Sequence, residues 1–247
     1  MNVIGVIPAR YDSSRFPGKP LVDIGGKSMI QRVYEQCSKS TSISKLIVAT
    51  DDQRIADHVK LFGGNVTLTS INHQSGTDRC AEVANNYPEF DILINIQGDE
   101  PMINPDQIDL LCKCFENPNA SIATLVKKIS SNEELFNENT PKVILNKNNE
   151  AILFSRTAIP FIRGKAKENW IEQYTFYKHI GIYGFKTETL KKLNNLPVSA
   201  LESAEALEQL RWIENGYRIH TAITDKESQA IDTPQDLEKL LKWINEC

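Results

Sequence analysis

Three cationic side chains lie in one short segment near the start of the chain, Pro8 to Pro20. Arg10, Arg15 and Lys19 are accompanied there by two serine hydroxyls and by Gly18. A polyphosphate is bound by fixed positive charge, hydrogen-bond donors and close approach of the backbone, and a glycine-containing loop after a strand supplies all three. The segment therefore predicts an anion site, with a basic surface turn held by its prolines as the alternative.

An acidic pair follows the predicted strand that runs through Ile94 and Ile96. The pair is Asp99 and Glu100, directly after Gly98. A hard cation such as Mg²⁺ takes one or two carboxylates and completes its coordination with water and substrate phosphate, so Asp99 is a candidate metal ligand. The alternative is that Gly98 and Asp99 only form a turn while Glu100 faces solvent.

Two further polar groups lie at predicted helix positions. The loop from His73 to Arg79 leads into a helix and offers backbone N–H groups and an arginine to an anion or a base, although Ser75 can simply cap that helix.

Farther along, Glu208 and Arg211 project into the apolar sector of a predicted helix and are three residues apart, so they can pair. A buried ion pair is the simpler interpretation of Arg211, whereas Glu208 can also offer an acceptor to a polyhydroxylated ligand.

Two common nucleotide-binding motifs are missing from the sequence. Gly26-Lys27-Ser28 matches the end of a Walker A loop, but the position that requires the first glycine holds Leu21. A P-loop kinase is therefore disfavoured. The sequence also contains no G-x-G-x-x-G, which removes the usual indication of a dinucleotide-binding fold.

Short apolar runs alternate with longer amphipathic segments in the first half of the chain. This alternation predicts βαβ units on a parallel sheet, in which function is expected beyond the carboxyl ends of the strands. The expected strands are Val3–Pro8, Lys45–Thr50, Asn65–Leu68 and Asp91–Ile96, and the expected helices are Ser28–Ser38, Asp52–Phe62, Thr77–Asn86 and Asn104–Phe115.

The second half of the chain has a different pattern. Short strands separated by polar turns predict an antiparallel element, with a hairpin connection at 147–150 and solvated surface over the Asn/Lys-rich stretch 132–149. The expected strands are Ser121–Lys127, Lys142–Asn146, Ala151–Phe154, His179–Phe185 and Tyr217–Ile223, and the expected helices are Leu201–Asn215 and Thr233–Glu246.

The composition is that of an ordinary globular protein. The chain has 247 residues, 28 basic against 32 acidic side chains, a net charge of −4 and an apolar share of 40%. At ~100–200 residues per domain this length allows one large domain or a domain with an appended lobe. A mildly acidic balance argues against a protein that coats nucleic acid, for which a pI above ~9 is expected.

Targeting segments and cysteine motifs are also missing. No apolar run approaches the ~18 residues that cross a bilayer, and the N-terminus lacks the basic region and cleavage site of a signal peptide. We therefore expect a cytoplasmic protein without membrane or nucleic-acid partners. The five cysteines form no C-x-x-C pair and are interpreted as reduced, structural thiols rather than a disulfide framework or a zinc site.

Seven segments together resemble the cytidylyltransferases that activate 3-deoxy-manno-octulosonate (Kdo). They follow one another in order across nearly the whole chain. The fifth and sixth listed below point more narrowly to the Kdo enzymes, whereas the first and third are shared more loosely with other sugar nucleotidyltransferases. The segments are V-I-P-A-R-Y-D-S-S-R-F-P-G-K-P-L at 6–21, H-Q-S-G-T-D-R at 73–79, I-Q-G-D-E-P at 96–101, F-S-R at 154–156, H-I-G-I-Y-G-F at 179–185, L-E-Q-L-R at 207–211 and I-D-T-P-Q-D-L-E at 231–238.

The resemblance implies an α/β, nucleotide-diphospho-sugar-transferase-like (Rossmann-like) fold with a mostly parallel sheet. It implies one nucleotidyltransferase domain over residues 1–247, with a smaller antiparallel dimerisation lobe roughly within 121–200 and a homodimer joined through that lobe. The implied reaction transfers CMP from CTP to the anomeric hydroxyl of Kdo with release of pyrophosphate, uses Mg²⁺ without a covalent enzyme intermediate, and serves lipopolysaccharide biosynthesis.

The same resemblance assigns roles to individual residues. It implies that Asp99 and Asp232 share the metal and that Arg10 and Lys19 act with them in catalysis. The implied nucleotide contacts are Ala9, Arg10, Arg15, Lys19, Ser75, Gly76, Arg79 and Gln97. The implied sugar contacts are Arg156, His179, Tyr183, Glu208 and Gln209, with the arginine facing the carboxylate of the sugar and the others facing its hydroxyls.

The sequence departs from the family pattern at Ala200-Leu201-Glu202-Ser203, where the Kdo enzymes often have P-L-E followed by histidine or a similar polar residue. This departure leaves an 8-amino variant of Kdo or a sialic-acid-like sugar open as the acceptor. A nucleotide-binding protein without turnover is the alternative from another class, and the presence of both Asp99 and Asp232 disfavours it.

Overall fold

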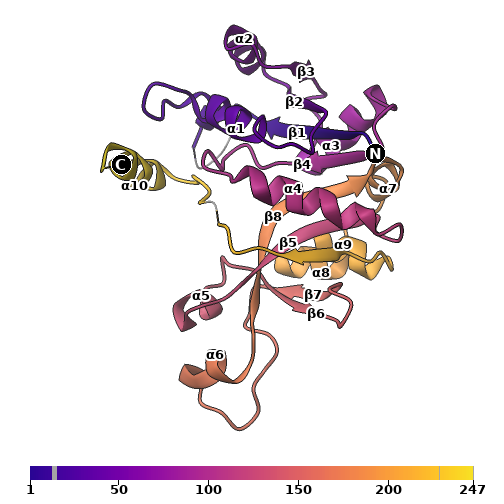
Figure 1. Ribbon diagram of the computed structural model, residues 1–247, viewed down its shortest axis with the longest axis vertical. Helices are drawn as coiled ribbons and strands as arrows, with labels where there is room; N and C mark the ends of the chain where they lie inside the picture. Colours follow the sequence, from indigo (N-terminus) through magenta and orange to yellow (C-terminus); the bar gives the residue numbers. More distant parts are fainter. Residues whose placement is uncertain (13–15, 228, 247) are drawn as a thin grey trace. The chain divides into compact units, whose positions relative to one another are not determined.

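The computed structural model describes residues 1–12, 16–227 and 229–246 (Figure 1). The chain divides into two compact units. The first comprises Met1–Asp109, Lys186–Asn194 and Glu227–Cys247, and the second comprises Leu110–Phe185 and Asn195–Lys226. Segments far apart in the sequence therefore contribute to the same unit.

The first unit is built on parallel strands. β1 (Val3–Ala9) pairs in parallel with both β2 (Lys45–Thr50) and β4 (Ile92–Asn95), and β2 pairs in parallel with β3 (Val66–Leu68). Nearly every residue of β1, β2 and β4 is buried, as expected for strands covered on both faces. The accompanying helices are α1 (Met29–Cys37), α2 (Gln53–Leu61), α3 (Gly76–Asn86), α7 (Thr187–Leu193) and α10 (Pro234–Glu246), together with the start of α4 (Pro105–Lys113). The predicted α/β class with a mostly parallel sheet is confirmed.

The second unit is mainly antiparallel. Its central strand β5 (Ile122–Lys128) pairs antiparallel with β8 (Tyr177–Lys186) and parallel with β9 (His220–Ile223). A hairpin of β6 (Lys142–Leu145) and β7 (Ala151–Ser155) adds to it, since β6 also pairs with β8. The hairpin predicted at 147–150 is confirmed, and Asn149 takes the positive φ of 57° that such a tight connection needs.

The predicted helix Leu201–Asn215 is wrong as a single element. It consists of α8 (Ala200–Glu205) and α9 (Gln209–Glu214), separated where Ala206 adopts φ 50°, ψ 48°. A left-handed residue cannot continue a right-handed helix, so the backbone carbonyls before the break are released from helical hydrogen bonding. Those carbonyls have other partners, described below.

The sequence pattern also does not predict two short helices of the second unit. α5 (Asn132–Phe136) and α6 (Trp170–Gln173) span a turn or so each, too short to establish an amphipathic period. Leu135 of α5 packs in a buried cluster with Ile129, Trp170 and Phe176, and Lys142 is buried as well. The expectation of solvated surface over 132–149 is therefore wrong at these positions.

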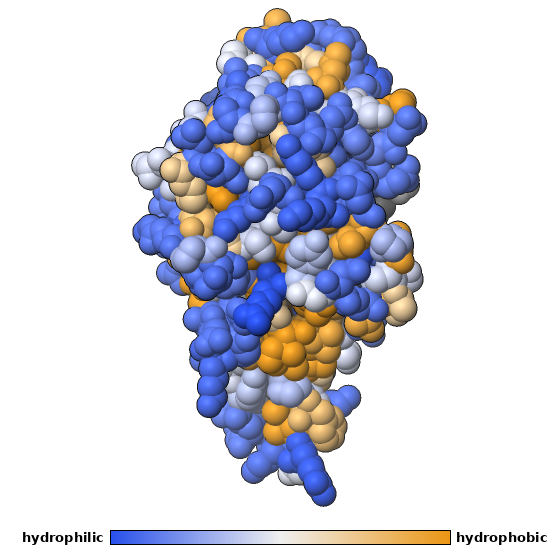
Figure 2. All heavy atoms as spheres, turned by 90° about the vertical axis from the view of Figure 1, so that its right-hand side faces the viewer, coloured by the Kyte–Doolittle hydropathy of each residue, from blue (hydrophilic) through white to orange (hydrophobic). Residues whose placement is uncertain are grey.

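Apolar side chains nevertheless remain at the surface of the second unit. Exposed large apolar residues there include Ile152 on β7, Phe161 and Ile223. Figure 2 shows an apolar patch in the lower half of one face of the molecule. Contiguous exposed apolar surface of this kind is typical of a site of association.

Four of the five cysteines lie within the described residues. Cys37, Cys80 and Cys112 are buried and Cys114 is half-buried, and all four are free, whereas Cys247 lies outside the described residues. Burial raises the pKa of Cys114 to about 11, so this thiol stays protonated at neutral pH. Among the described residues, no helix is both long and apolar enough to cross a membrane.

The burial of Leu135 yields a stability prediction. Leu135→Ala should lower the free energy of unfolding by about 2–5 kcal/mol, because it removes a fully buried side chain and leaves a cavity. The matched control is Leu61→Ala, since Leu61 is 85% exposed. It should change stability by less than about 0.5 kcal/mol in the same urea titration. Equal effects of the two substitutions would contradict the packing of α5 described here.

Candidate functional site

A polar cavity of about 400 Å³ opens in the first unit at the carboxyl ends of β1 and β4. It receives the loop after β1, the loop after β4 and the first residue of α3. The lining residues are Pro8, Ala9, Arg10, Asp12, Lys19, Pro20, Gly76, Gln97, Gly98 and Asp99. The sequence therefore places the cavity where ligands bind in open α/β sheets.

Glycines allow the loops around this cavity to approach one another closely. A Cβ atom on Gly98 would lie 2.7 Å from the carbonyl oxygen of Pro8, a contact that real Cβ atoms do not make. Gly18 adopts φ 72°, and its N–H donates to the carbonyl of Tyr11 at 2.8 Å, which closes the cation-rich loop. Arg15, one of the predicted nucleotide contacts, lies outside the described residues.

Arg10 carries a buried and unpartnered cationic nitrogen. Its Nη2 atom has no hydrogen-bond partner in the described part of the chain, although the residue lines the cavity. Buried donors of this kind are costly unless an acceptor satisfies them, and a guanidinium prefers phosphate or carboxylate oxygens. An anion in the cavity would satisfy this nitrogen.

Two carboxylates converge on the ammonium group of Lys19. Lys19 Nζ lies 2.7 Å from Asp99 Oδ2 and 3.4 Å from Asp232 Oδ1. The neighbouring Ile231 fixes the approach of Asp232, because its N–H donates to the carbonyl of Asp99 at 2.9 Å. Ile231 is itself buried against Ile24 and Met29.

The start of α10 holds the other side of Asp232. The carboxylate of Asp236 accepts hydrogen bonds from the N–H of Asp232 at 3.3 Å and from the N–H of Thr233 at 3.0 Å. The hydroxyl of Thr233 donates to the same carboxylate at 2.8 Å and is the main reason why the pKa of Asp236 is lowered. An ionised Asp236 therefore keeps the backbone at Asp232 in one conformation.

The residues present fit a bound Mg²⁺ ion. Asp99 and Asp232 both reach the position of a single cationic atom, now the ammonium of Lys19. Two carboxylates are the usual protein contribution to a Mg²⁺ site that is completed by water and substrate phosphate. No group of three or more His, Cys, Asp or Glu side chains that could hold a metal is present within the described ranges.

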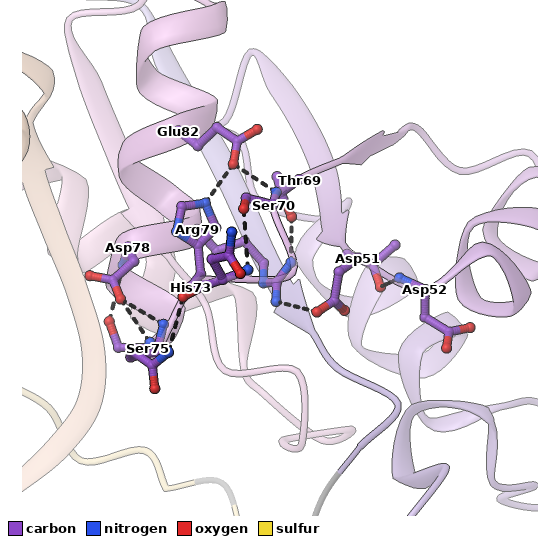
Figure 3. A network of polar contacts seen from close by, with 12 residues as sticks. Asp51, Asp52, Thr69, Ser70, His73, Ser75, Asp78, Arg79 and Glu82 are labelled. Carbon is purple, nitrogen blue, oxygen red and sulfur yellow. Dashed lines mark hydrogen bonds and ion pairs between the residues drawn. The ribbon is translucent and has the colours of Figure 1, made fainter.

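Arg79 does not line the cavity. It is completely buried, its Nη2 atom donates to Asp51 at 3.0 Å, and its Nη1 atom donates to Thr69 (Figure 3). A carboxylate thus already neutralises this guanidinium. A direct contact between Arg79 and a nucleotide stays a prediction, and the geometry favours a structural role that ties the loop after β3 to α3.

The loop before α3 is organised by its own acidic groups (Figure 3). Ser75 caps the helix, since its hydroxyl accepts from the N–H of Asp78 at 3.1 Å and the carboxylate of Asp78 accepts from the N–H of Ser75 at 2.9 Å. The structure confirms that Ser75 caps the helix. A contact of Ser75 with a nucleotide stays a prediction. Burial opposes ionisation of Glu82, but hydrogen bonds from Ser70 and His73 outweigh it and lower the pKa of this carboxyl.

In the second unit, four of the predicted sugar contacts lie on β8 and at the start of α9. His179 and Tyr183 have ring centroids 5.1 Å apart, and Tyr183 lies 5.0 Å from Trp212 of α9. The Tyr183 hydroxyl and Gln209 Nε2 are buried without a hydrogen-bond partner among the described residues. Burial, and then the charge of Glu208, raise the pKa of Tyr183, which stays a neutral phenol. Buried polar atoms without a partner are uncommon in native structures.

Arg156 is held by carbonyl oxygens alone. Its Nε donates to the carbonyl of Glu205 at 2.6 Å, Nη1 to that of Glu138 at 3.1 Å and Nη2 to that of Ala206 at 3.3 Å. The break between α8 and α9 makes two of these carbonyls available. No carboxylate within the described ranges forms an ion pair with the guanidinium, so its charge remains for a ligand in the adjoining cavity.

That cavity has a volume of about 500 Å³ and is lined by Phe136, Glu138, Arg156, Thr157, Ala158, Lys167 and Glu205. Lys142 carries a further charge that interacts with Glu138 and Glu205 of this lining. It is buried, and its Nζ donates to the carbonyl of Asn137 at 2.8 Å. Burial lowers the pKa of Lys142, while Glu138 and Glu205 counteract that effect. The sequence analysis missed Lys142 because a lysine in a predicted strand has no local mark of burial.

Arg211 forms an ion pair with Glu202. Its Nε and Nη2 atoms donate to the two carboxylate oxygens of Glu202 at 2.7 and 2.6 Å. Glu208 precedes α9, and its backbone carbonyl accepts from the N–H of Arg211, so a side-chain pair of these two residues stays a prediction. The structural interpretation of Arg211 itself agrees with this half-buried ion pair.

Comparison with known proteins identifies the family of this chain. Residues 4–220 match the family described as cytidylyltransferase. The chain is 55% identical to the 3-deoxy-manno-octulosonate cytidylyltransferase of Parabacteroides distasonis and 54% identical to that of Bacteroides thetaiotaomicron, in each case over 99% of this chain and 98% of the relative.

Solved structures agree with the family that the sequence relatives indicate. The structure of a CMP:2-keto-3-deoxy-manno-octonic acid synthetase complexed with CTP is similar with a TM-score of 0.92 and 42% identity, covering 100% of this chain and 99% of the other. A 4-diphosphocytidyl-2C-methyl-D-erythritol synthase from Anaerococcus prevotii, at 10% identity and a TM-score of 0.62 over 99% of both chains, shares the fold. The chain therefore belongs to the cytidylyltransferase family, among the 3-deoxy-manno-octulosonate cytidylyltransferases.

Proposed function

We propose that this protein transfers CMP from CTP to the anomeric hydroxyl of Kdo and releases pyrophosphate, supplying activated Kdo for lipopolysaccharide in the cytoplasm. The observation that carries the proposal is the group formed by Asp99, Asp232 and Lys19 in a cavity that Arg10 also lines, with its Nη2 atom unpartnered among the described residues. It combines fixed cations for a triphosphate with two carboxylates for a divalent metal. The names of the relatives supply the nucleotide and the sugar.

In-line displacement at the α-phosphorus requires positioning and charge neutralisation rather than a covalent intermediate. Arg10 and Lys19 would hold the triphosphate and offset the charge that develops on departing pyrophosphate, and Arg15 is proposed to act with them. Asp99 and Asp232 would hold Mg²⁺, which supplies neutralisation at phosphate oxygens and lowers the pKa of a hydroxyl bound to it. Ala9, Ser75, Gly76, Arg79 and Gln97 are the proposed remaining contacts of the nucleotide.

The sugar contacts suit an acid with many hydroxyl groups. Arg156 keeps an unneutralised charge for the carboxylate of Kdo. Four further side chains, His179, Tyr183, Glu208 and Gln209, would meet hydroxyls through neutral or acceptor groups. Because the proposed nucleotide contacts lie in the first unit and the proposed sugar contacts in the second, substitutions should affect the two KM values separately.

The deciding experiment measures pyrophosphate release by the purified protein with Mg²⁺ and CTP. Kdo is compared with 8-amino-Kdo, N-acetylneuraminate, a sugar phosphate and a control without sugar. Release with Kdo alone is expected. Release only with another sugar would replace the acceptor, and CTP binding without release for any sugar would favour a non-catalytic nucleotide-binding protein.

The metal role of Asp99 predicts a kinetic effect. Asp99→Asn should reduce kcat by about 10²–10³-fold at ordinary Mg²⁺ concentrations, because it removes one of two anionic ligands while keeping the shape of the side chain. Circular dichroism should show an unchanged fold. Asp106→Asn removes the same charge from the exposed first turn of α4 and should leave kcat unchanged. A wild-type rate for Asp99→Asn would refute the metal role.

Arg156 predicts a selective effect on the sugar. Arg156→Ala should raise the KM for Kdo by about 10–100-fold, the usual range for losing a charge-assisted hydrogen bond, and should leave the KM for CTP within about twofold. Arg163→Ala is the matched control, since Arg163 is an exposed arginine of the same unit. If Arg156→Ala leaves the KM for Kdo unchanged, the carboxylate site must be elsewhere.

We also propose that two copies associate through the smaller, antiparallel lobe. The exposed Ile152 on β7 supports this, because β7 pairs with β6 alone among the described strands and so offers an apolar side chain at an open edge. The Ile152 side chain is 52% exposed.

Sedimentation tests this association. The wild type should have about twice the 27.9 kDa mass of one chain, and Ile152→Glu should shift it toward the single-chain mass because burying a carboxylate at the interface is costly. Leu61→Glu places the same charge on an exposed leucine of the first unit and should leave the dimer intact. A monomeric wild type would contradict the proposal.

A further inference from the structure

A fully buried threonine contacts the ring of His179 from the neighbouring strand. Thr124 lies on β5, and its Oγ1 atom is 3.0 Å from His179 Nε2, 2.7 Å from the carbonyl oxygen of Ile182 and 3.2 Å from that of Ile180. The pairing of β5 with β8 shifts at this point, with Thr124 opposite Tyr183 and Leu125 opposite Ile180. The extra residues in β8 bring the carbonyls of Ile180 and Ile182 close to the hydroxyl of Thr124.

Counting protons determines which nitrogen of His179 is protonated. A threonine hydroxyl has one proton to donate, and both carbonyl oxygens can only accept. The proton of Thr124 therefore points to a carbonyl, of which Ile182 is the closer. The contact with His179 is then satisfied only if Nε2 carries a proton and donates it to Oγ1. With the opposite tautomer, the hydroxyl would donate to Nε2, and neither carbonyl oxygen would receive the proton of Thr124.

The ring is also kept neutral. Phe154 packs edge-on against it with centroids 5.2 Å apart, Tyr183 covers another side, and enclosure lowers the pKa of His179 to about 3. With Nε2 protonated and the ring uncharged, Nδ1 must present a lone pair. In the described part of the chain neither Nδ1 nor the nearby Tyr183 hydroxyl has a hydrogen-bond partner.

We propose that Thr124 is a positioning residue that fixes the Nε2–H tautomer of His179, so that Nδ1 accepts a hydrogen bond from a hydroxyl group of the sugar. The proposal rests on the proposed function, because it assigns His179 to the sugar site. It adds a directional requirement: the ligand must offer a donor to Nδ1. A neutral acceptor beside the neutral phenol of Tyr183 matches an alcohol and rejects a second carboxylate at that position.

The tautomer is measured directly by NMR of protein labelled with ¹⁵N-histidine. The chain has 4 histidines, and His179→Gln identifies the signals of His179. The expected spectrum shows a protonated Nε2 and an unprotonated Nδ1 that do not titrate between about pH 5 and 8, because the lowered pKa lies below this window. A protonated Nδ1, or titration near pH 6.5, would overturn the proposal whatever the substrate is.

Kinetics test the consequence for binding. Thr124→Val removes the hydroxyl with little change of shape and should raise the KM for Kdo by about five- to tenfold, with the KM for CTP unchanged. Thr124→Ser should restore most of the loss. Thr221→Val is the matched control, because Thr221 lies opposite Thr124 on β9. Its hydroxyl donates to the carbonyl of Asn149 at 2.7 Å and not to a group of β8. It should leave both KM values unchanged.

The outcomes separate the inference from the function on which it rests. If His179→Gln raises the KM for Kdo but Thr124→Val does not, the positioning role is overturned while the sugar site stands. If His179→Gln leaves the KM for Kdo unchanged, the sugar role of His179 is lost, and with it the acceptor role of Nδ1. Should Thr124→Val fail to fold, the wild-type spectrum decides the tautomer by itself.

Discussion

Two carboxylates brought together repel each other, and in the first unit a cation in contact with both Asp99 and Asp232 reduces that repulsion. Lys19 supplies that cation, at 2.7 and 3.4 Å from the two side chains. The backbone bond from Ile231 to Asp99 and the burial of Ile231 keep the returning chain at the end of β4. The ammonium offsets one of the two negative charges, and a divalent metal in exchange for the ammonium contact would offset both.

The arginines divide according to their partners. Arg79 and Arg211 each face a carboxylate, which offsets their charge. Arg10 has a buried nitrogen without an acceptor in the described part of the chain, and Arg156 is held by carbonyl dipoles that orient it without cancelling its charge. A guanidinium that is oriented but not neutralised is prepared for an anion, because little reorganisation is needed on binding.

The second unit relies on neutral polar groups more than the first does. Enclosure keeps His179 uncharged and Tyr183 protonated, so both are neutral hydrogen-bonding groups. A sugar acid has one charge and many hydroxyls, and the proposed set of one guanidinium, that of Arg156, with several hydrogen-bonding partners corresponds to that chemistry. The irregular pairing of β5 with β8 is what brings Thr124 into contact with the ring of His179.

The sequence by itself determined the βαβ half of the fold and the cation-rich loop, because period and turn chemistry are local properties. It assigned Asp232 to the metal only through resemblance to a family. The break at Ala206, the partner of Arg211 and the burial of Lys142 were decided by tertiary contacts. Each depends on which group, distant in the sequence, accepts a hydrogen bond or covers a side chain. No local pattern in the sequence predicts such a contact.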